Sequence, residues 1–422
     1  MLKHTLTLSA RDLLFFRDAR PLGGSDEGAG GRWPLPNVLH AAVLSAFHDR
    51  WPELDPSCES RHTNWKDKEK ARAERGKSPD RSSLRFGGLR TIGPFPYIAR
   101  GVNGRGGGLM QAGLYLPSPA DLVPGGIMHP VRLPAGTASN LPAPLRYAVA
   151  AATPPSKEDV EPWLAVAEFV SYLQGRAQAA TTRAGDLYLT ETRPGVGIDP
   201  ATHAHREHVF YQAEYLRLRE GVELCAWAHA ETRKSGQNSS PAKDLLAEFV
   251  ATGIDLRFGG QGGVASGRLT PAVTVDLPKP APGQKRLKWI LLTPALFTAG
   301  WRPGWVDTEG RIRLTVEQNG AKQPISGRLV AARVGKPILV SGWKLDVAGD
   351  HSGGRPKATR LLLAPGTVYY FELDDAQAAQ RFIDALHLKP KSDELGEKGF
   401  GLGVCGTWDF LDLKSTTANG KE

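Results

Sequence analysis

Apolar residues recur at helical spacing in two distant parts of the chain, and in both parts a glycine-rich turn and a strand follow. The first of these helices is predicted to begin after Ser240-Pro241 and to end at Gly253. Its inner face has the i, i+3, i+4, i+7 spacing of one helix side, with Ala242, Leu245, Leu246, Phe249 and Val250. A turn of sequence FGGQGG follows at 258–263, and a strand is predicted at 270–277.

The second copy begins at Asp374-Asp375, where an aspartate can cap a helix by accepting hydrogen bonds from its free backbone N–H groups. The inner face of this helix carries Ala379, Phe382, Ile383 and Leu386. Its glycine-rich turn consists of Gly396, Gly399, Gly401, Gly403 and Gly406, and a strand is predicted at 402–408. Because two such units occupy comparable places, the pattern indicates a duplicated domain.

The remaining apolar pattern of the first half supplies the other elements of a small α+β domain. Alternation predicts strands at 4–16, 209–219 and 222–229, and the short break at Glu220-Gly221 predicts that the last two form a hairpin. A helix is predicted at 38–50. With the helix and strand around the first glycine-rich turn, the order is βαββαβ, which is the ferredoxin-like or RRM-like arrangement.

The second half repeats this order in part. Strands are predicted at 287–292, 328–332, 337–345 and 359–372, and no clear first helix is present. We therefore predict an α+β fold of two ferredoxin-like domains, at about 1–278 and 286–422. A large loop-rich insertion at about 52–205 interrupts the first domain, and it contains one predicted helix at 162–173.

Composition narrows the class of protein. A chain of 422 residues with 48 Gly and 32 Pro is too long for one ordinary core and must contain many turns. The chain contains no run of about eighteen apolar residues, so no membrane-spanning helix is predicted. Residues 1–8 alternate like a strand and do not resemble a signal peptide. The isolated Cys58, Cys225 and Cys405 fit neither a paired-cysteine zinc site nor a disulfide scaffold. We expect a cytoplasmic protein without a membrane partner.

Charge points to a polyanionic partner. The formal net charge is +9, and the segment from Arg61 to Arg90 holds ten basic against four acidic residues with almost no apolar ones. Such a segment cannot bury enough surface to order itself. We expect a mobile basic arm at 59–90 that settles on RNA or on a protein partner.

Five segments resemble one family. They are Asp12–Pro21, Ile92–Pro96 with the sequence IGPFP, Leu114–Asp121 with the sequence LYLPSPAD, Glu191–Asp199 together with Phe210–Leu218, and the two glycine-rich turns. In this order they resemble the RAMP proteins of CRISPR effector complexes, and among them the Cmr-type subunit of type III-B complexes. The resemblance covers residues 12 to about 408.

The resemblance implies a non-catalytic role without a cofactor. It also implies three partners, which are the 5′ handle of the crRNA, the large polymerase/cyclase-like subunit and a backbone RAMP subunit. Residues 91–145 hold scattered apolar side chains, among them Phe95, Tyr97, Leu109, Leu114 and Leu116, with no obvious helix to cover them. We expect this stretch to dock on the large subunit.

The predicted RNA-binding residues combine arginines with the first glycine-rich turn. An arginine binds phosphate through two parallel hydrogen bonds, and glycine allows close approach of the backbone. The candidates are Arg17, Arg20, Arg32, Arg193, Arg257, Gly259, Gly260, Gln261, Gly262, Gly263 and Arg268. Single-stranded RNA also needs aromatic rings on which its bases stack, and Phe16, Trp33 and Phe258 adjoin the same loops.

Other interpretations of these residues stay open. The turn at 260–265 fits the dinucleotide-binding pattern G-x-G-x-x-A, but that pattern needs a strand before it and a helix after it; a purely structural turn is the other alternative. A metal site is conceivable at the closely spaced His203, His205 and His208, but no nearby Cys or carboxylate cluster would complete the set of ligands. His48-Asp49 resembles a phosphohydrolase pair without its companions.

The main rival function is a RAMP endoribonuclease that matures precursor crRNA. Such enzymes use a histidine on a helix as general base. His40 lies one turn into the predicted helix at 38–50 and is the candidate for this role.

Overall fold

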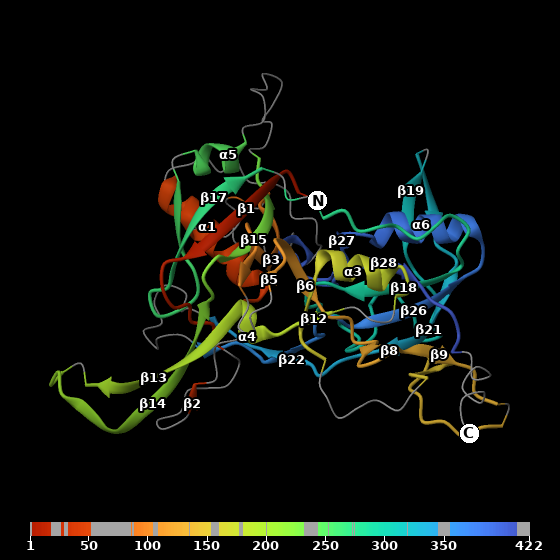
Figure 1. The fold of residues 1–422 in the computed structure, drawn as a ribbon, viewed down its shortest axis with the longest axis horizontal. Coiled ribbons are helices and arrows are strands. Elements are labelled where there is room, and N and C mark those ends of the chain that lie inside the picture. The colour runs from red at the N-terminus through yellow and green to blue at the C-terminus, as the bar shows by residue number, and fades with distance from the viewer. Residues whose placement is uncertain are drawn as a thin grey trace.

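The computed structural model is composed mostly of strands, with few helices (Figure 1). It describes residues 2–17, 27–28, 33–51, 86, 88–103, 109–134, 136–152, 160–176, 180–199, 201–231, 244–251, 253–271, 273, 275–318, 320–344 and 355–411. Arg20, Arg32 and nearly all of the basic arm predicted at 59–90 lie outside these residues. Within the described ranges, no helix is long and apolar enough to cross a membrane.

The first sheet has eight strands, and each neighbouring pair is antiparallel. In spatial order they are β12 (Thr181–Thr182), β11 (Trp163–Ala165), β6 (Gly113–Pro117), β3 (Arg90–Ile98), β15 (Val222–His229), β1 (His4–Ala10), β17 (Val264–Thr270) and β16 (Ile254–Arg257). Helices α1 (Pro36–Arg50) and α5 (Leu245–Val250) bury their apolar sides against one face of this sheet. Leu39, Val43 and Leu246 are fully buried there.

The second sheet has five strands and one covering helix. The spatial order is β21 (Gly327–Arg333), β26 (Val368–Leu373), β18 (Arg286–Leu291), β28 (Leu402–Thr407) and β27 (Lys389–Pro390). Helix α6 (Ala376–Leu386) packs on one face through Phe382 and Leu386. Asp375 caps it by accepting a 2.7 Å hydrogen bond from the Ala378 N–H, as the sequence predicts.

The two glycine-rich turns occupy equivalent places in the two sheets. In the first sheet, β16, the turn at 258–263 and β17 follow helix α5, and β17 pairs with β1. In the second sheet, β27, the turn and β28 follow helix α6, and β28 pairs with β18. The order β3-β15-β1-β17-β16 therefore matches the order β21-β26-β18-β28-β27 position by position.

The predicted hairpin of 209–219 with 222–229 is wrong. Strand β14 (His205–Leu218) pairs with β13 (Tyr188–Ile198), and the two form a long arm that extends from the body (Figure 1). Strand β15 pairs instead with β1 and β3. The second neighbour of β15 in the sheet is therefore β3, which lies inside the range predicted as an insertion. Alternation marks a segment as a strand but does not identify its partner.

The strand predicted at 270–277 is also misplaced. Strand β17 begins immediately after the glycine-rich turn and ends at Thr270. Pro271 follows and has no N–H for the ladder, which explains why pairing stops there. The helix predicted at 162–173 is present only as α3 (Val166–Leu173), after strand β11.

The remaining elements are short and lie around these two sheets. They are β2 (Glu27–Gly28), β4 (Val102–Asn103), β5 (Leu109–Met110), β7 (Leu122–Val123), β8 (Gly126–Ile127), β9 (His129–Val131), β10 (Ala148–Ala150), α4 (Ala184–Leu187), β19 (Thr315–Gln318), β20 (Ala321–Pro324), β22 (Ile338–Val340), β23 (Trp343–Lys344), β24 (Arg355–Pro356), β25 (Arg360–Leu362) and the 3-10 helix η3 (Gly396–Lys398).

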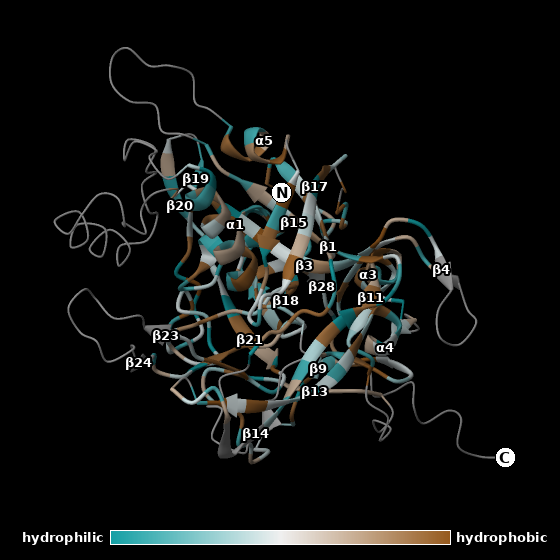
Figure 2. Cartoon of the chain, turned by 90° about the vertical axis from the view of Figure 1, so that its left-hand side faces the viewer, coloured by the Kyte–Doolittle hydropathy of each residue, from teal (hydrophilic) through white to brown (hydrophobic). Residues whose placement is uncertain are grey.

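A shared core joins the two halves. Trp227 on β15 belongs to the same buried cluster as Ile290 on β18 and Val404 on β28. Figure 2 shows apolar residues on strands β3 and β21. Phe95, Leu114 and Leu116 are part of this cluster and are at most 2% exposed. The expectation that such residues of 91–145 need an external partner is therefore wrong, because the chain's own insertion and second half cover them.

Candidate nucleic-acid interface

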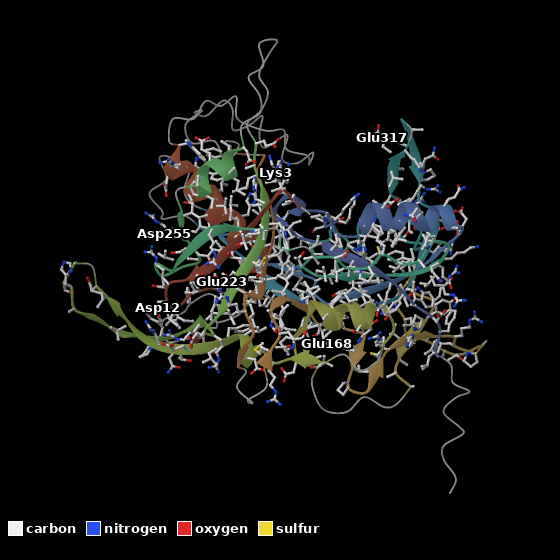
Figure 3. All side chains as sticks on the ribbon, turned by 45° about the horizontal axis from the view of Figure 1, so that its top comes forward. Lys3, Asp12, Glu168, Glu223, Asp255 and Glu317 are labelled. Carbon is white, nitrogen blue, oxygen red and sulfur yellow. The ribbon has the colours of Figure 1, made fainter. Side chains whose placement is uncertain are left out.

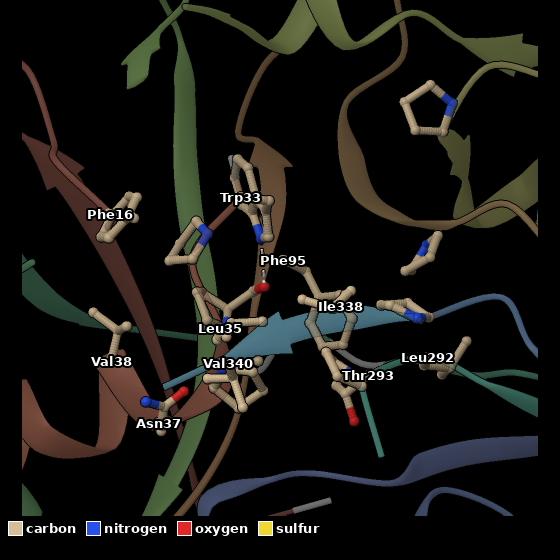
Figure 4. A pocket seen from close by; sticks show the side chains of 18 of the residues that line it. Phe16, Trp33, Leu35, Asn37, Val38, Phe95, Leu292, Thr293, Ile338 and Val340 are labelled. Carbon is tan, nitrogen blue, oxygen red and sulfur yellow. Dashed lines mark hydrogen bonds between the residues drawn. The ribbon is translucent and has the colours of Figure 1, made fainter. Parts of the chain in front are cut away.

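A cavity of about 950 Å³ lies where the two halves meet (Figure 4). The first half contributes residues 15–17, 33–38, 93–95 and the first glycine-rich turn. Residues 117–120 contribute another wall, and 292–294 with strand β22 belong to the second half. Four of the segments that resemble the RAMP family thus meet here, although they are far apart in the sequence.

The base of the first glycine-rich turn is held against the segment that follows β1. The Gly260 N–H donates a 2.8 Å hydrogen bond to the carbonyl oxygen of Phe15. A Cβ atom at Gly259 would collide with the same oxygen, and Gly259 has φ +89°. Glycine is therefore required at this point by the close crossing of two backbone segments.

The tip of the same turn is open to solvent. Gln261 and Gly262 both have positive φ, at 54° and 71°, and the Gly263 N–H closes the turn with a 3.1 Å bond to the carbonyl of Gly260. Gly259 to Gly262 are exposed. A Cβ atom on Gly262 would meet nothing within 4 Å. The tip can therefore be approached closely by another molecule.

Two of the predicted arginines line the cavity. Arg17 and Arg257 are both exposed, and they lie on the cavity wall with Gly259 and Gly260. Neither forms an ion pair with any residue that the structure describes. A cationic rim beside bare backbone N–H groups suits an anion such as phosphate.

Arg268 and Arg193 lie elsewhere. Arg268 is on β17 of the first sheet, where its guanidinium is 2.8 Å from the carboxylate of Glu223 on β15; Figure 3 labels Glu223. Arg193 is on the arm and binds Glu191 at 3.1 Å. Within the described chain, the cavity therefore brings together Arg17, Arg257, Gly259 and Gly260, but neither Arg268 nor Arg193.

The cavity walls combine apolar side chains with polar groups. Figure 4 shows Leu35, Phe95, Ile338 and Val340 around it, and the Trp33 Nε1–H donates a 2.8 Å bond to the carbonyl of Pro94. The other two aromatic candidates, Phe16 and Phe258, are buried and pack edge-on against each other. These two rings are core residues rather than surfaces on which a base can stack.

Asn37 supplies a polar group that the sequence did not reveal. It lies in the first turn of α1, and its Oδ1 atom is buried without a hydrogen-bond partner in the described chain. Asn37 lines the cavity (Figure 4). A buried acceptor without a partner is costly, so a ligand that donates a hydrogen bond at this point would remove that cost.

The second glycine-rich turn is closed. Gly399 and Gly401 are buried, and the Thr293 hydroxyl donates a 2.7 Å bond to the carbonyl of Gly399. A Cβ atom at Gly399 would lie 2.9 Å from the Cα of Ile92 on β3. This turn therefore packs against the first half and has no free surface at Gly399 for a ligand.

His40 lies beneath this second turn. Its Nδ1 is 3.2 Å from the Thr91 hydroxyl, and the residue is only 8% exposed. Burial, together with the positive charges of Lys398 and Arg90, lowers the pKa of His40 to about 3. A neutral, enclosed imidazole is poorly placed to act as the general base of an endoribonuclease.

Asp121, at the end of the LYLPSPAD segment, joins the halves beside the cavity. Its carboxylate accepts bonds from Lys288 Nζ at 2.9 Å and from the hydroxyls of Tyr172 and Tyr370 at 2.5 and 3.0 Å. Burial, with the Asp121 charge, raises the pKa of both tyrosines well above their ordinary value. Asp121 therefore connects the cavity wall at 117–120 to the second sheet.

The histidine cluster gives no metal site in the described part of the chain. His203 is exposed near the tip of the arm, and the side chains of His205 and His208 lie outside the described residues. No three His, Cys, Asp or Glu side chains among the described residues are grouped to hold one ion. His48 packs against the ring of Phe86.

Sequence comparison gives the family of the chain. The model of the family described as CRISPR-associated protein (Cas_Cmr3) matches residues 6–408, so the chain belongs to this family. It is a subunit of a type III CRISPR-Cas effector complex. No curated protein matches the chain.

Two solved structures are similar to this chain at low identity. One is the type III-B Cmr-beta bound to cognate target RNA and AMPPnP, at 11% identity and a TM-score of 0.41, covering 87% of this chain and 86% of that chain. The other is the Csm3-Csm4 subcomplex of the type III-A interference complex, at 9% identity and a TM-score of 0.36, covering 89% and 94%.

Proposed function

We propose that this chain is a non-catalytic, crRNA-binding scaffold subunit that grips the 5′ handle of the crRNA in the cavity between its halves. The observation that carries the proposal is the open first glycine-rich turn, placed with Arg17 and Arg257 at the wall of the cavity. Membership in a family of type III effector subunits supplies the class of partner.

The chemistry of the cavity suits a single-stranded nucleotide. Arg17 and Arg257 neutralise phosphate, and the glycine-rich turn lets the RNA backbone approach. The first turn of α1 contains no acidic residue, so its free N–H groups add positive potential. An unstacked base fits against the apolar walls, and its amino group can donate to Asn37 Oδ1. Base contacts of this kind would supply sequence preference.

We also propose that the two halves are ferredoxin-like domains of the RAMP type, at about 1–278 and 286–422. The matching strand orders of the two sheets support this assignment. A helix equivalent to α1 is missing between β18 and β21 in the described residues of the second half, so the second domain is the less complete copy.

We expect the subunit to contact the large polymerase/cyclase-like subunit and a backbone RAMP subunit of the same complex. The exposed Val196 and Ile198 on the arm provide apolar surface for one such contact. A neighbour that covers them would explain why two β-branched residues face solvent at the end of a long hairpin.

The experiment is a titration of labelled crRNA with purified protein at several salt concentrations. Arg17→Ala and Arg257→Ala should each weaken binding and reduce the slope of log affinity against log salt by about 0.7, because each removes one phosphate contact. Arg313→Ala is the matched control, since its side chain is 62% exposed and pairs with Asp307. Binding equal to that of the parent in both cavity variants would refute the cavity as the RNA site.

The same RNA decides between handle recognition and general RNA binding. Exchanging the handle bases should weaken binding more than exchanging the spacer bases, since the cavity is expected to contact bases. Cleavage of repeat RNA without metal would instead support the rival endoribonuclease. Abolition of that cleavage by His40→Ala would place the reaction at a residue that the fold encloses.

A further inference from the structure

The small sheet of β22 and β25 has two different faces. Ile338 and Val340 on β22 face the cavity (Figure 4), Leu339 between them also contributes to its lining, and Leu362 on β25 is 1% exposed. Successive side chains of a strand point to opposite sides. Leu339 and Leu361 therefore point outward, and the register places them directly opposite each other.

This outward pair is exposed to an unusual degree. Leu339 is 47% exposed and Leu361 is 60% exposed, and Leu361 has the largest value among the exposed large apolar residues that the structure describes. A single exposed leucine needs no explanation, but two that adjoin on neighbouring strands form a continuous patch. Strands β22 and β25 pair with each other, and Leu363, directly after β25, forms an isolated bridge with Ala295; among the described residues, β22 has no second partner strand.

The described residues around the patch are mainly basic, and Glu394 is a neighbouring acidic residue. Residues 333–344 and 357–363 contain five basic residues and no Asp or Glu, namely Arg333, Lys336, Lys344, Lys357 and Arg360. Arg360 pairs with Glu394, and the Arg333 Nε–H donates to the carbonyl of Ala120. Lys336 and Lys357 are exposed and form no ion pair with the described residues. The rim of the patch therefore favours an acidic partner.

We propose that the outer face of the β22–β25 sheet is a docking surface for another protein subunit of the effector complex. The partner surface has an apolar centre that covers Leu339 and Leu361, and an acidic rim that faces Lys336 and Lys357. Membership in a family of effector-complex subunits supports such a neighbour. The proposal does not depend on RNA binding in the cavity.

A nucleic acid fits this face less well than a protein does. Leucine neither stacks on bases as aromatic rings do nor hydrogen-bonds to them. The described residues of the sheet's outer face present leucines at the centre and cations only at the rim. Burial of the two leucines would stabilise a protein interface through the hydrophobic effect.

The geometry also predicts a consequence for the complex. The same two strands present Ile338 and Val340 to the cavity on one side and the leucine patch on the other. The docked subunit would therefore lie directly behind a wall of the cavity. The outward leucines contribute to docking, whereas the inward residues contribute to the cavity.

The test measures binding of purified variants to the effector complex reconstituted without this subunit. The double variant Leu339→Ser with Leu361→Ser should bind about tenfold more weakly or worse, because truncating the apolar centre of an interface has the largest effects. Leu133→Ser is the matched control, since Leu133 is also an exposed leucine, at 37%, but lies off this sheet. Parent-like binding of the double variant would overturn the proposal.

A charge-reversal variant tests docking without changing an apolar residue, so its result does not depend on whether the leucine variant folds. Lys336→Glu with Lys357→Glu changes only exposed side chains and should also weaken docking, with an effect that diminishes as salt increases. Affinity of the single variant Leu361→Ser for isolated crRNA should stay within about twofold of the parent, because Leu361, unlike Leu339, does not line the cavity. Loss of crRNA affinity in step with docking would overturn the separation of the two surfaces.

Crosslinking identifies the occupant directly. A photoreactive amino acid in place of Leu361 should crosslink to a protein subunit of the assembled complex, at a peptide rich in Asp, Glu and aliphatic residues. A crosslink to RNA, or no crosslink in the assembled complex, would contradict the proposal. Because this readout does not use the cavity, it fails independently of handle binding.

Discussion

The two glycine-rich turns have the same place in their sheets and opposite surroundings. In the first turn, Gly259 to Gly262 are exposed beside the cavity. In the second turn, Gly399 and Gly401 are buried, and Gly399 lies against strand β3 of the other half. One turn uses glycine to leave room for an incoming molecule, and the other uses glycine to let the two halves of the chain pack together.

The first test of this comparison is Gly399→Ala, for which we expect the largest effect. The added Cβ would meet the Ile92 Cα at 2.9 Å with φ at +89°, so unfolding free energy should fall by about 3 kcal/mol or more. Gly283→Ala is the control, because Gly283 also has φ +89° but nothing within 4 Å. Equal losses in urea unfolding of the two variants would show that packing at the second turn contributes nothing.

The second test uses pH, because His40 lies under the same turn. The pKa of His40 is about 3 in the folded chain, and its ordinary value, taken for the unfolded chain, is 6.5. Between these values only the unfolded chain takes up the proton. Stability should therefore fall by about 1.4 kcal/mol per pH unit between these values because of this group. The measurement is the unfolding free energy of the parent and of His40→Gln at pH 7 and at pH 5. The difference between their two pH dependences gives the contribution of His40. Identical pH slopes would contradict the buried neutral histidine.

The third test addresses the open turn. Gly262→Ala adds a Cβ that meets nothing within 4 Å, so only its φ of +71° should cost stability, about 1 kcal/mol. Its affinity for crRNA should fall by about tenfold if RNA approaches the tip closely. Gly320→Ala is the matched control, because Gly320 has φ +74° and its added Cβ would also meet nothing within 4 Å, on another hairpin. Equal crRNA affinity in both variants would mean that the tip does not contact RNA.

The smallest expected effect comes from Arg268→Ala. The side chain is 58% exposed and pairs with Glu223 outside the cavity, so both unfolding free energy and crRNA affinity should change little, by about 0.5 kcal/mol or less. Titration of crRNA at low salt checks this. A loss as large as that of Arg17→Ala would extend the RNA path over the outer face of the first sheet.

Local patterns of the sequence predicted much of the secondary structure. The helix at 38–50 corresponds to α1, and the Asp375 cap marks the start of α6, because amphipathic spacing and capping depend on near neighbours along the chain. The strand at 222–229 is also present as β15. Its partner was predicted wrongly, since the intervening 14-residue strand β14 pairs with β13 in another sheet.

The candidate site was predicted only in part, for a related reason. Arg17, Arg257 and the first glycine-rich turn meet at the cavity, but nothing local distinguished them from Arg268, whose ion pair with Glu223 joins residues 45 positions apart. Asn37 and the wall from β22 were missed altogether. A buried acceptor without a partner is a property of three-dimensional packing and leaves no mark in the sequence.

By itself, the sequence determined the helices, the positions of the glycine-rich turns, the basic charge and the resemblance to RAMP proteins. These depend on spacing, composition and residue order, which are all present in the unfolded chain. Tertiary structure alone decided which strands pair, which glycine-rich turn is open and which is buried, and which arginines share a cavity. These follow from contacts between residues far apart in sequence, and burial of the shared core between the halves selects those contacts.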